Sequence, residues 1–166
     1  MEEMERSKEY ELFAIYGMSI EYPSGWSIEA GPLRRDQGSV TFRPKGEEHS
    51  CVLTWTPLNA VQKRFRDPRE QARKALDDFK GRSHVKDLEV LEDRSIVVNG
   101  HEAALMRLRA TLKTGLFSRG RLKSEIQVLY LHCDETQRCF VLFSFGPQED
   151  KYANIFNHMA CSMRCH

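Results

Sequence analysis

The chain has 166 residues, of which 40% are hydrophobic and 30% are charged, and its formal net charge is +1. This length suits one domain that can bury a core without metal or disulfide support. The composition excludes disordered and collagen-like proteins, and the nearly neutral charge gives no general reason to expect a nucleic-acid partner. No run of apolar residues approaches the roughly 18 to 20 that a membrane-spanning helix needs.

No internal repeat and no Pro/Gly/Ser-rich linker divides the sequence, so we expect a single domain over residues 1–166. Residues 1–9 are acidic and polar, which predicts a mobile acidic tail and does not fit a signal peptide. The five cysteines are an odd number, which favours reduced thiols over a disulfide framework. Together these features predict a cytoplasmic protein.

The first predicted strands lie in the N-terminal third. Residues 18–22 alternate between apolar and polar side chains, Pro23-Ser24-Gly25 interrupts the pattern, and the alternation resumes at residues 26–28. This arrangement predicts a β-hairpin. Two further strands are expected at residues 39–43 and 51–56.

A helix is predicted next. Asp67 is a suitable N-cap, Pro68 suits the first helical position, and Glu70 completes a capping box. Apolar residues follow at helical spacing, and Gly81 stands where a left-handed C-terminal cap is expected.

The second half of the chain predicts long strands joined by tight turns. Residues 88–98 look extended and end at Asn99-Gly100, a strong hairpin signal. Residues 103–113 and 122–132 both alternate in character, so they are expected to pair in antiparallel fashion.

If the turn between these two strands centres near Phe117, Arg109 lies opposite or diagonal to Glu125, which predicts a cross-strand ion pair. Residues 138–145 are apolar on both faces and predict a central strand. Gly146-Pro147 is expected to open a final amphipathic helix.

Many hairpins and two predicted helices exclude a doubly wound parallel sheet, which needs a helix between nearly every pair of strands. We therefore expect an α+β fold with a mainly antiparallel sheet of six to seven strands. Because one strand is apolar on both faces and both helices have an apolar stripe, helices are expected on both faces of the sheet.

Several segments resemble the PsbP-like superfamily. Residues 16–26 are similar to its "GFSI-x-YP-x-x-W" opening, and the Asn99-Gly100-His101 turn and the final "Y-x-x-I-F-x-x-M" helix also match. The resemblance spans about residues 10–164. It implies an α/β/α sandwich and an accessory or protein-binding role without a shared catalytic motif.

No glycine-rich phosphate loop, nucleophile elbow or zinc-protease motif is present, so we expect no enzyme activity, no cofactor and no metal. Cys161, Cys165 and His166 could bind a soft metal, but their spacing offers no fourth ligand nearby. Cys133 and Cys139 flank a turn and could approach each other, although free thiols are favoured in a reducing compartment.

The clearest functional signal is a basic stretch without acids between Glu102 and Glu125, with an apolar tip. Such a hairpin could dock on an acidic protein, an anionic membrane surface or RNA, or could simply be solvated. The candidate partner-binding residues are Lys113, Leu116, Phe117, Arg119, Arg121 and Lys123.

Three further interpretations remain open at the level of sequence. The chain could carry a small ligand between the sheet and a helix, beside Trp26, Trp55, Arg107 and Arg109. Nucleic-acid binding and an enzyme rank below this alternative. The leading hypothesis is an accessory domain that binds another protein as a monomer or weak homo-oligomer.

Overall fold

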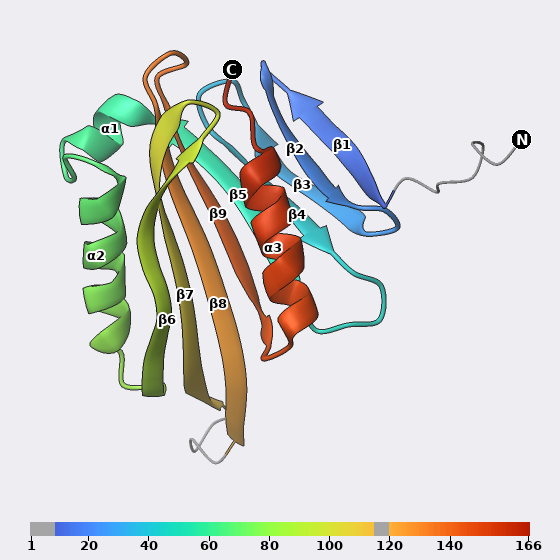
Figure 1. The fold of residues 1–166 in the computed structure, drawn as a ribbon, viewed down its shortest axis with the longest axis vertical. Helices are drawn as coiled ribbons and strands as arrows, with labels where there is room; N and C mark the ends of the chain where they lie inside the picture. The colour runs from blue at the N-terminus through green and yellow to red at the C-terminus, as the bar shows by residue number, and fades with distance from the viewer. Residues whose placement is uncertain (1–8, 115–119) are drawn as a thin grey trace, which may run out of the picture.

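The computed structural model describes residues 9–114 and 120–166, so the expected mobile tail lies almost entirely outside the described residues. A seven-stranded antiparallel sheet forms the middle layer. One face carries the helix α3 (Asp150–Ser162) beside a two-stranded sheet, and the other carries the helix α2 (Pro68–Lys80) (Figure 1). The predicted α+β sandwich with helices on both faces is confirmed.

The large sheet has a spatial order of strands that differs from their order along the chain. Across the sheet its strands are β3 (Ser27–Leu33), β4 (Gly38–Arg43), β5 (Ser50–Pro57), β9 (Arg138–Pro147), β8 (Gly120–Cys133), β7 (His101–Thr114) and β6 (Val85–Val98). The small sheet pairs β1 (Tyr10–Ile15) with β2 (Met18–Pro23), and a short helix α1 (Leu58–Gln62) follows β5. None of the described helices is long and apolar enough to span a membrane.

Alternation along the long strands divides the buried side chains into two clusters. Odd positions of β7 and β8, such as Leu105 and Leu129, pack towards α3 and the β1–β2 hairpin. Even positions, such as Met106 and Val128, pack towards α2. This division decides where every functional side chain of the two strands points, because neighbouring residues of a strand face opposite sides.

The predicted central strand is β9, which stands in the middle of the sheet with three strands on each side. Its side chains towards α3 are buried, including Phe140 and Leu142. On the other face α2 does not cover the strand completely, since Phe143 is 36% exposed.

Several local predictions are wrong. Residues 18–28 do not form one hairpin, because β2 pairs with β1 and β3 pairs with β4. Pro23-Ser24-Gly25 therefore turns the chain from one sheet into the other. Gly81 ends α2 with φ −76°, an ordinary right-handed conformation, and α3 begins at Asp150 because Gly146 and Pro147 still belong to β9.

Candidate functional site

The predicted ion pair between β7 and β8 is confirmed and involves a second arginine. Arg109 lies directly opposite Glu125 in the register, and its Nε donates to Oε1 of Glu125 over 3.0 Å. Arg107 donates to the same oxygen through Nε at 3.1 Å and Nη2 at 2.9 Å. The side chain of Glu125 is 3% exposed, so one buried carboxylate pairs with two guanidinium groups, and Nη2 of Arg107 also lies 3.8 Å from Oδ1 of the exposed Asp150.

Farther along the same face, the basic side chains have no such partner. Lys113 lies directly opposite Arg121, and Lys123 stands two positions farther along β8. All three occupy odd positions, so they project from the same face as Arg107 and Arg109. Among the described residues, none of the three forms an ion pair within 4.0 Å. We call Lys113, Arg121 and Lys123 the basic triad.

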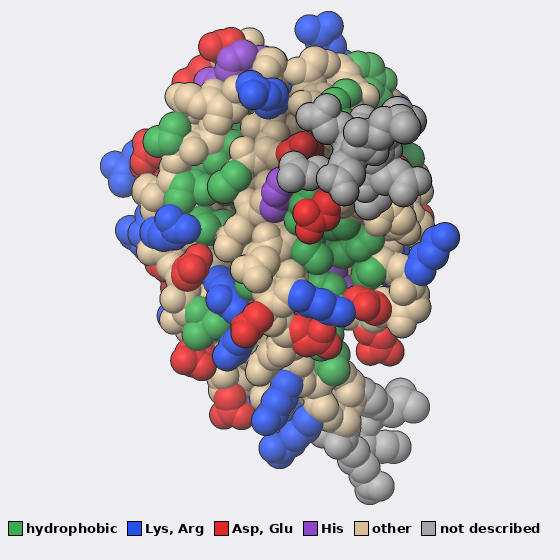
Figure 2. All heavy atoms as spheres, turned by 45° about the vertical axis from the view of Figure 1, so that its right-hand side comes forward, with side chains coloured by type: hydrophobic (Ala, Val, Ile, Leu, Met, Phe, Trp, Pro, Cys, Tyr) green, Lys and Arg blue, Asp and Glu red, His purple; other side chains and the backbone are tan. Residues whose placement is uncertain are grey.

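A small cavity of about 240 Å³ adjoins the basic triad. Lys86, Asp87, Thr111, Lys113 and Arg121 line it, so three bases face one acid. Figure 2 shows lysine and arginine side chains gathered at the lower end of the molecule, where Figure 1 places the end of β7 and the start of β8. The other three predicted partner-binding residues, Leu116, Phe117 and Arg119, lie outside the described residues.

Among the five cavities described for this structure, only one is lined by a candidate ligand-binding residue, Trp55. Trp55 is fully buried and its Nε1 donates to the carbonyl of Arg34 over 2.8 Å. A cavity of about 560 Å³ beside it is lined by residues of β3, β4 and β5 and the turn between β3 and β4, but not by Trp26, Arg107 or Arg109. Trp26 instead packs edge-on against His49, with ring centroids 5.7 Å apart.

A buried polar cluster lies near the start of β5. His49 stacks on Tyr152 with ring centroids 3.9 Å apart, and its Nε2 lies 3.4 Å from Oγ of Ser144. Burial, with a smaller contribution from Lys151, lowers the pKa of His49 to about 4, against the opposing effect of Glu47. Ser144 is 1% exposed and does not line the cavity that His49 adjoins, so the pair offers no accessible nucleophile.

Four possible metal ligands converge at the opposite end of the sheet. The side chains of His101, Cys133, Cys165 and His166 bring one ligand atom each to within 4.8 Å of one another. They come from the start of β7, the end of β8 and the segment after α3. Cys133 and Cys165 are fully buried, whereas His101 is half-buried and His166 is exposed.

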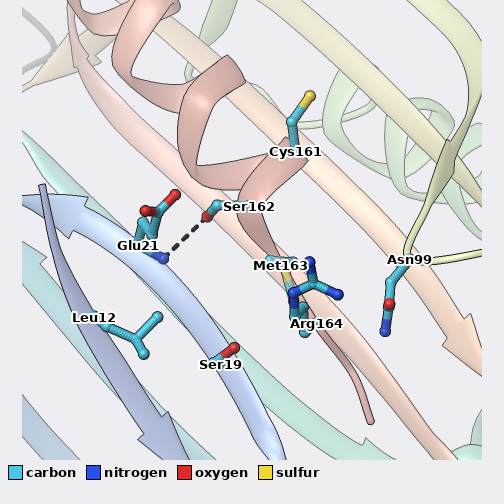
Figure 3. A pocket seen from close by; sticks show the side chains of 8 residues that line it. All are labelled: Leu12, Ser19, Glu21, Asn99, Cys161, Ser162, Met163 and Arg164. Atoms are coloured by element: carbon cyan, nitrogen blue, oxygen red, sulfur yellow. Dashed lines mark hydrogen bonds between the residues drawn. The ribbon is translucent and has the colours of Figure 1, made fainter.

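The structure separates the cysteines that the sequence places near each other: Cys133 does not face Cys139, and Cys161 does not join Cys165 and His166. Cys133 contacts His101 on the α3 side of the sheet, whereas Cys139 faces Gln71 of α2, with Sγ and Oε1 3.6 Å apart. Cys161 is exposed and lines a separate cavity of about 330 Å³ between the β1–β2 hairpin and the end of α3. Figure 3 shows its side chain pointing away from Arg164 and the segment that follows.

Sequence reasoning missed the four-ligand cluster although one signal was available. The register that pairs Arg109 with Glu125 continues to Ala103 and Leu131, so His101 and Cys133 follow two positions later at the same edge of the sheet. A search limited to ligands close together in the sequence does not find this pair. The approach of the segment after α3 is a tertiary contact that periodicity alone does not reveal.

Comparison with solved structures places the fold among PsbP-like and Mog1-like domains. The Ran-binding protein Mog1p of Saccharomyces cerevisiae superposes with a TM-score of 0.62 at 10% identity, over 93% of this chain and 94% of Mog1p. The cyanobacterial PsbP of Synechocystis gives a TM-score of 0.58 at 12% identity, over 95% and 93% of the two chains.

These likenesses confirm the fold that the sequence motifs indicated, and at such low identity they establish the fold alone. No protein-family model matches the sequence, and no curated protein matches it either.

Proposed function

We propose that this chain is a non-enzymatic protein-interaction domain that docks an acidic segment of another protein on the basic triad. The observation that carries this proposal is the pairing of Lys113 with Arg121 across β7 and β8, where neither forms an ion pair with a described acid. Directly opposed like charges destabilise a sheet by a few tenths of a kcal/mol to about 1 kcal/mol. An acidic partner would turn this cost into attraction.

The contrast with the neighbouring arginines supports a role in binding. Arg107 and Arg109 lie on the same face and both pair with Glu125, which shows that this sheet can provide a carboxylate where charge is buried. The triad lies farther out, where Arg121 and Lys123 are exposed. Exposed charge of one sign steers an oppositely charged partner and raises the rate of encounter.

The adjoining cavity offers a place for one acidic side chain of the partner. Lys86, Lys113 and Arg121 surround it, and the Thr111 hydroxyl can donate a hydrogen bond to a carboxylate. Asp87 also lines the cavity and would repel a carboxylate placed next to it. The favoured partner segment is therefore one whose carboxylates lie towards the triad. The proposal also includes that the chain acts in the cytoplasm as a monomer or weak homo-oligomer.

The shared fold supports binding of a protein as the class of function, because Mog1p, described as a Ran-binding protein, has the same arrangement of elements. The choice of the basic triad as the docking surface rests on the charges of this chain and not on the surface that Mog1p uses.

A peptide titration tests the proposal. A fluorescent glutamate-rich peptide should bind the full chain with an affinity that falls as salt rises, because mobile ions screen exposed charges. Replacing Lys113 and Arg121 together by glutamate should weaken binding roughly tenfold, at about 0.5 to 1 kcal/mol for each reversed charge.

The matched control is Lys45→Glu, on the exposed turn between β4 and β5, which changes charge without touching the triad. Equal binding by the wild type and the double variant contradicts the proposal. So does stronger binding of a single-stranded oligonucleotide or an anionic lipid vesicle than of the peptide.

A second candidate function is small-ligand carriage, at a site other than the one that the sequence predicts beside Trp26 and Trp55. A groove of about 310 Å³ lies between α2 and the sheet, and ten of its eleven lining residues are apolar, among them Phe79, Met106 and Phe143. This volume and lining are typical of the lower end of ligand pockets. An apolar fluorescent probe should bind the wild type and the Val97→Trp variant, which is changed at an exposed position of β6. The same probe should not bind the Met106→Trp variant, in which the larger side chain fills the groove. This result would favour ligand carriage.

A further inference from the structure

We propose that His101, Cys133, Cys165 and His166 bind one Zn²⁺ ion as a closed structural site. This zinc site would join the start of β7, the end of β8 and the segment that follows α3. It is distinct from the basic triad, which lies at the other end of β7 and β8. The proposal therefore stands independently of the proposed function.

The distances between the ligand atoms fit a tetrahedral ion. Zn–S bonds of about 2.3 Å and Zn–N bonds of about 2.0 to 2.1 Å place tetrahedral ligands roughly 3.3 Å apart for two nitrogens and roughly 3.5 Å apart for nitrogen and sulfur. Nε2 of His101 lies 3.3 Å from Nδ1 of His166. Sγ of Cys133 lies 3.8 Å from the first nitrogen and 3.9 Å from the second. Sγ of Cys165 lies 3.4 Å from Nδ1 of His166.

Neighbouring polar groups orient the ligands as in known zinc sites. Nε2 of His166 lies 3.1 Å from a carboxylate oxygen of Glu135, which favours a proton on Nε2 and leaves Nδ1 free to bind a metal. Metal-binding histidines usually donate their second nitrogen in this way. The amide of Asn99 lies 3.5 Å from Sγ of Cys165, where it can stabilise a thiolate.

The segment that provides two of the ligands is held in place by backbone contacts. Ser19 and Arg164 exchange backbone hydrogen bonds of 2.8 and 2.9 Å, which ties the residue before Cys165 to β2. Nη2 of Arg138 donates to the carbonyl of Cys165 over 3.3 Å. The guanidinium of Arg138 is buried and forms no ion pair with a described acid.

The ligand set selects the metal and the role. Two thiolates and two imidazoles prefer zinc among the common divalent ions, whereas magnesium and calcium prefer oxygen ligands. Four protein ligands leave no coordination position for a substrate. A structural role follows, because catalytic zinc sites keep one position open.

Cobalt substitution tests the site directly. Untagged protein, treated with a chelator and a reductant, should bind one equivalent of Co²⁺, with the intense visible bands of a tetrahedral ion and a near-ultraviolet thiolate-to-cobalt band. Zn²⁺ should displace the cobalt and raise the unfolding temperature. Mass spectrometry under native conditions should show one zinc per chain.

Matched variants locate the ion. Cys133→Ala and His101→Gln should lose the thiolate-to-cobalt band or its tetrahedral character. Cys139→Ala, at a buried thiol on the other face of the same hairpin, should retain both. Circular dichroism confirms that each variant folds, and an unfolded Cys133→Ala would leave His101→Gln, at a partly accessible residue, to decide.

Two results would overturn the proposal. One is the absence of a thiolate-to-cobalt band in the reduced wild type, or an equal band in Cys133→Ala. The other is a protein that binds no metal when reduced and forms a Cys133–Cys165 disulfide when oxidised, which would make the cluster a redox pair.

Discussion

Replacing Glu125 by glutamine tests the buried charge network between β7 and β8. Oε1 of Glu125 accepts three hydrogen bonds from Arg107 and Arg109 at 2.9 to 3.1 Å, and the Glu125 side chain is 3% exposed. Removal of one partner of a fully buried ion pair costs roughly 3 to 5 kcal/mol. Because the two arginine side chains are 20% and 35% exposed and can be hydrated, we expect about 2 kcal/mol.

Urea unfolding followed by circular dichroism measures this loss, and thermal unfolding should show a decrease of about 4 to 8 °C for a chain of this size. The control is Glu89→Gln on β6. Glu89 also stands opposite Arg109 in the register, but it is exposed and no ion pair joins it to that arginine. A loss below about 0.5 kcal/mol for Glu125→Gln, or equal losses for both variants, would refute the reasoning.

Two further predictions concern stability. The pKa of His49 is lowered to about 4 in the folded protein, below the ordinary value of 6.5, so the unfolded chain binds the extra proton first as pH falls. The free energy of unfolding should therefore decrease from pH 6.5 to pH 4, by at most ~3 kcal/mol from this residue. His49→Gln should flatten the pH profile of unfolding. An unchanged profile would contradict the lowered pKa of His49. Gly38→Ala should cost about 2 to 3 kcal/mol, because the added Cβ would clash with the indole ring of Trp55. Gly81→Ala, where the added Cβ would meet no atom closer than 3.6 Å, should cost little. Equal unfolding midpoints for the two variants would contradict this packing.

The parts of the fold that sequence predicts well are those set by local alternation. The paired strands β7 and β8 follow from period-two patterns, and their register follows from one turn centre, so the contact between Arg109 and Glu125 could be predicted. The central position of β9 follows from apolar residues on both faces, since only a covered strand tolerates them.

The failures concern contacts between distant segments. A turn such as Pro23-Ser24-Gly25 predicts a change of direction but not which strand the chain meets next, and in this fold the partners of β2 and β3 lie in different sheets. The short strand β1 and helix α1 carry little pattern of their own. Only Phe13 and Ile15 of β1 pack against the core, and only Leu58 of α1 is buried.

The candidate sites differ in the same way. The charge of the basic triad is visible in the sequence, but only the structure shows that none of its side chains forms an ion pair with a described acid. The zinc ligands His101, Cys133 and Cys165 are separated by more than thirty residues in each interval, so only the tertiary fold brings them together.

The most direct test of the proposed function is Arg121→Glu, with peptide binding and urea unfolding measured on the same preparation. The substitution places an acid opposite Lys113, so the fold should be as stable as the wild type or more stable by a few tenths of a kcal/mol. Binding of the glutamate-rich peptide should nevertheless fall severalfold, because the basic triad loses its central charge. A folded variant that binds the peptide as tightly as the wild type would contradict the account.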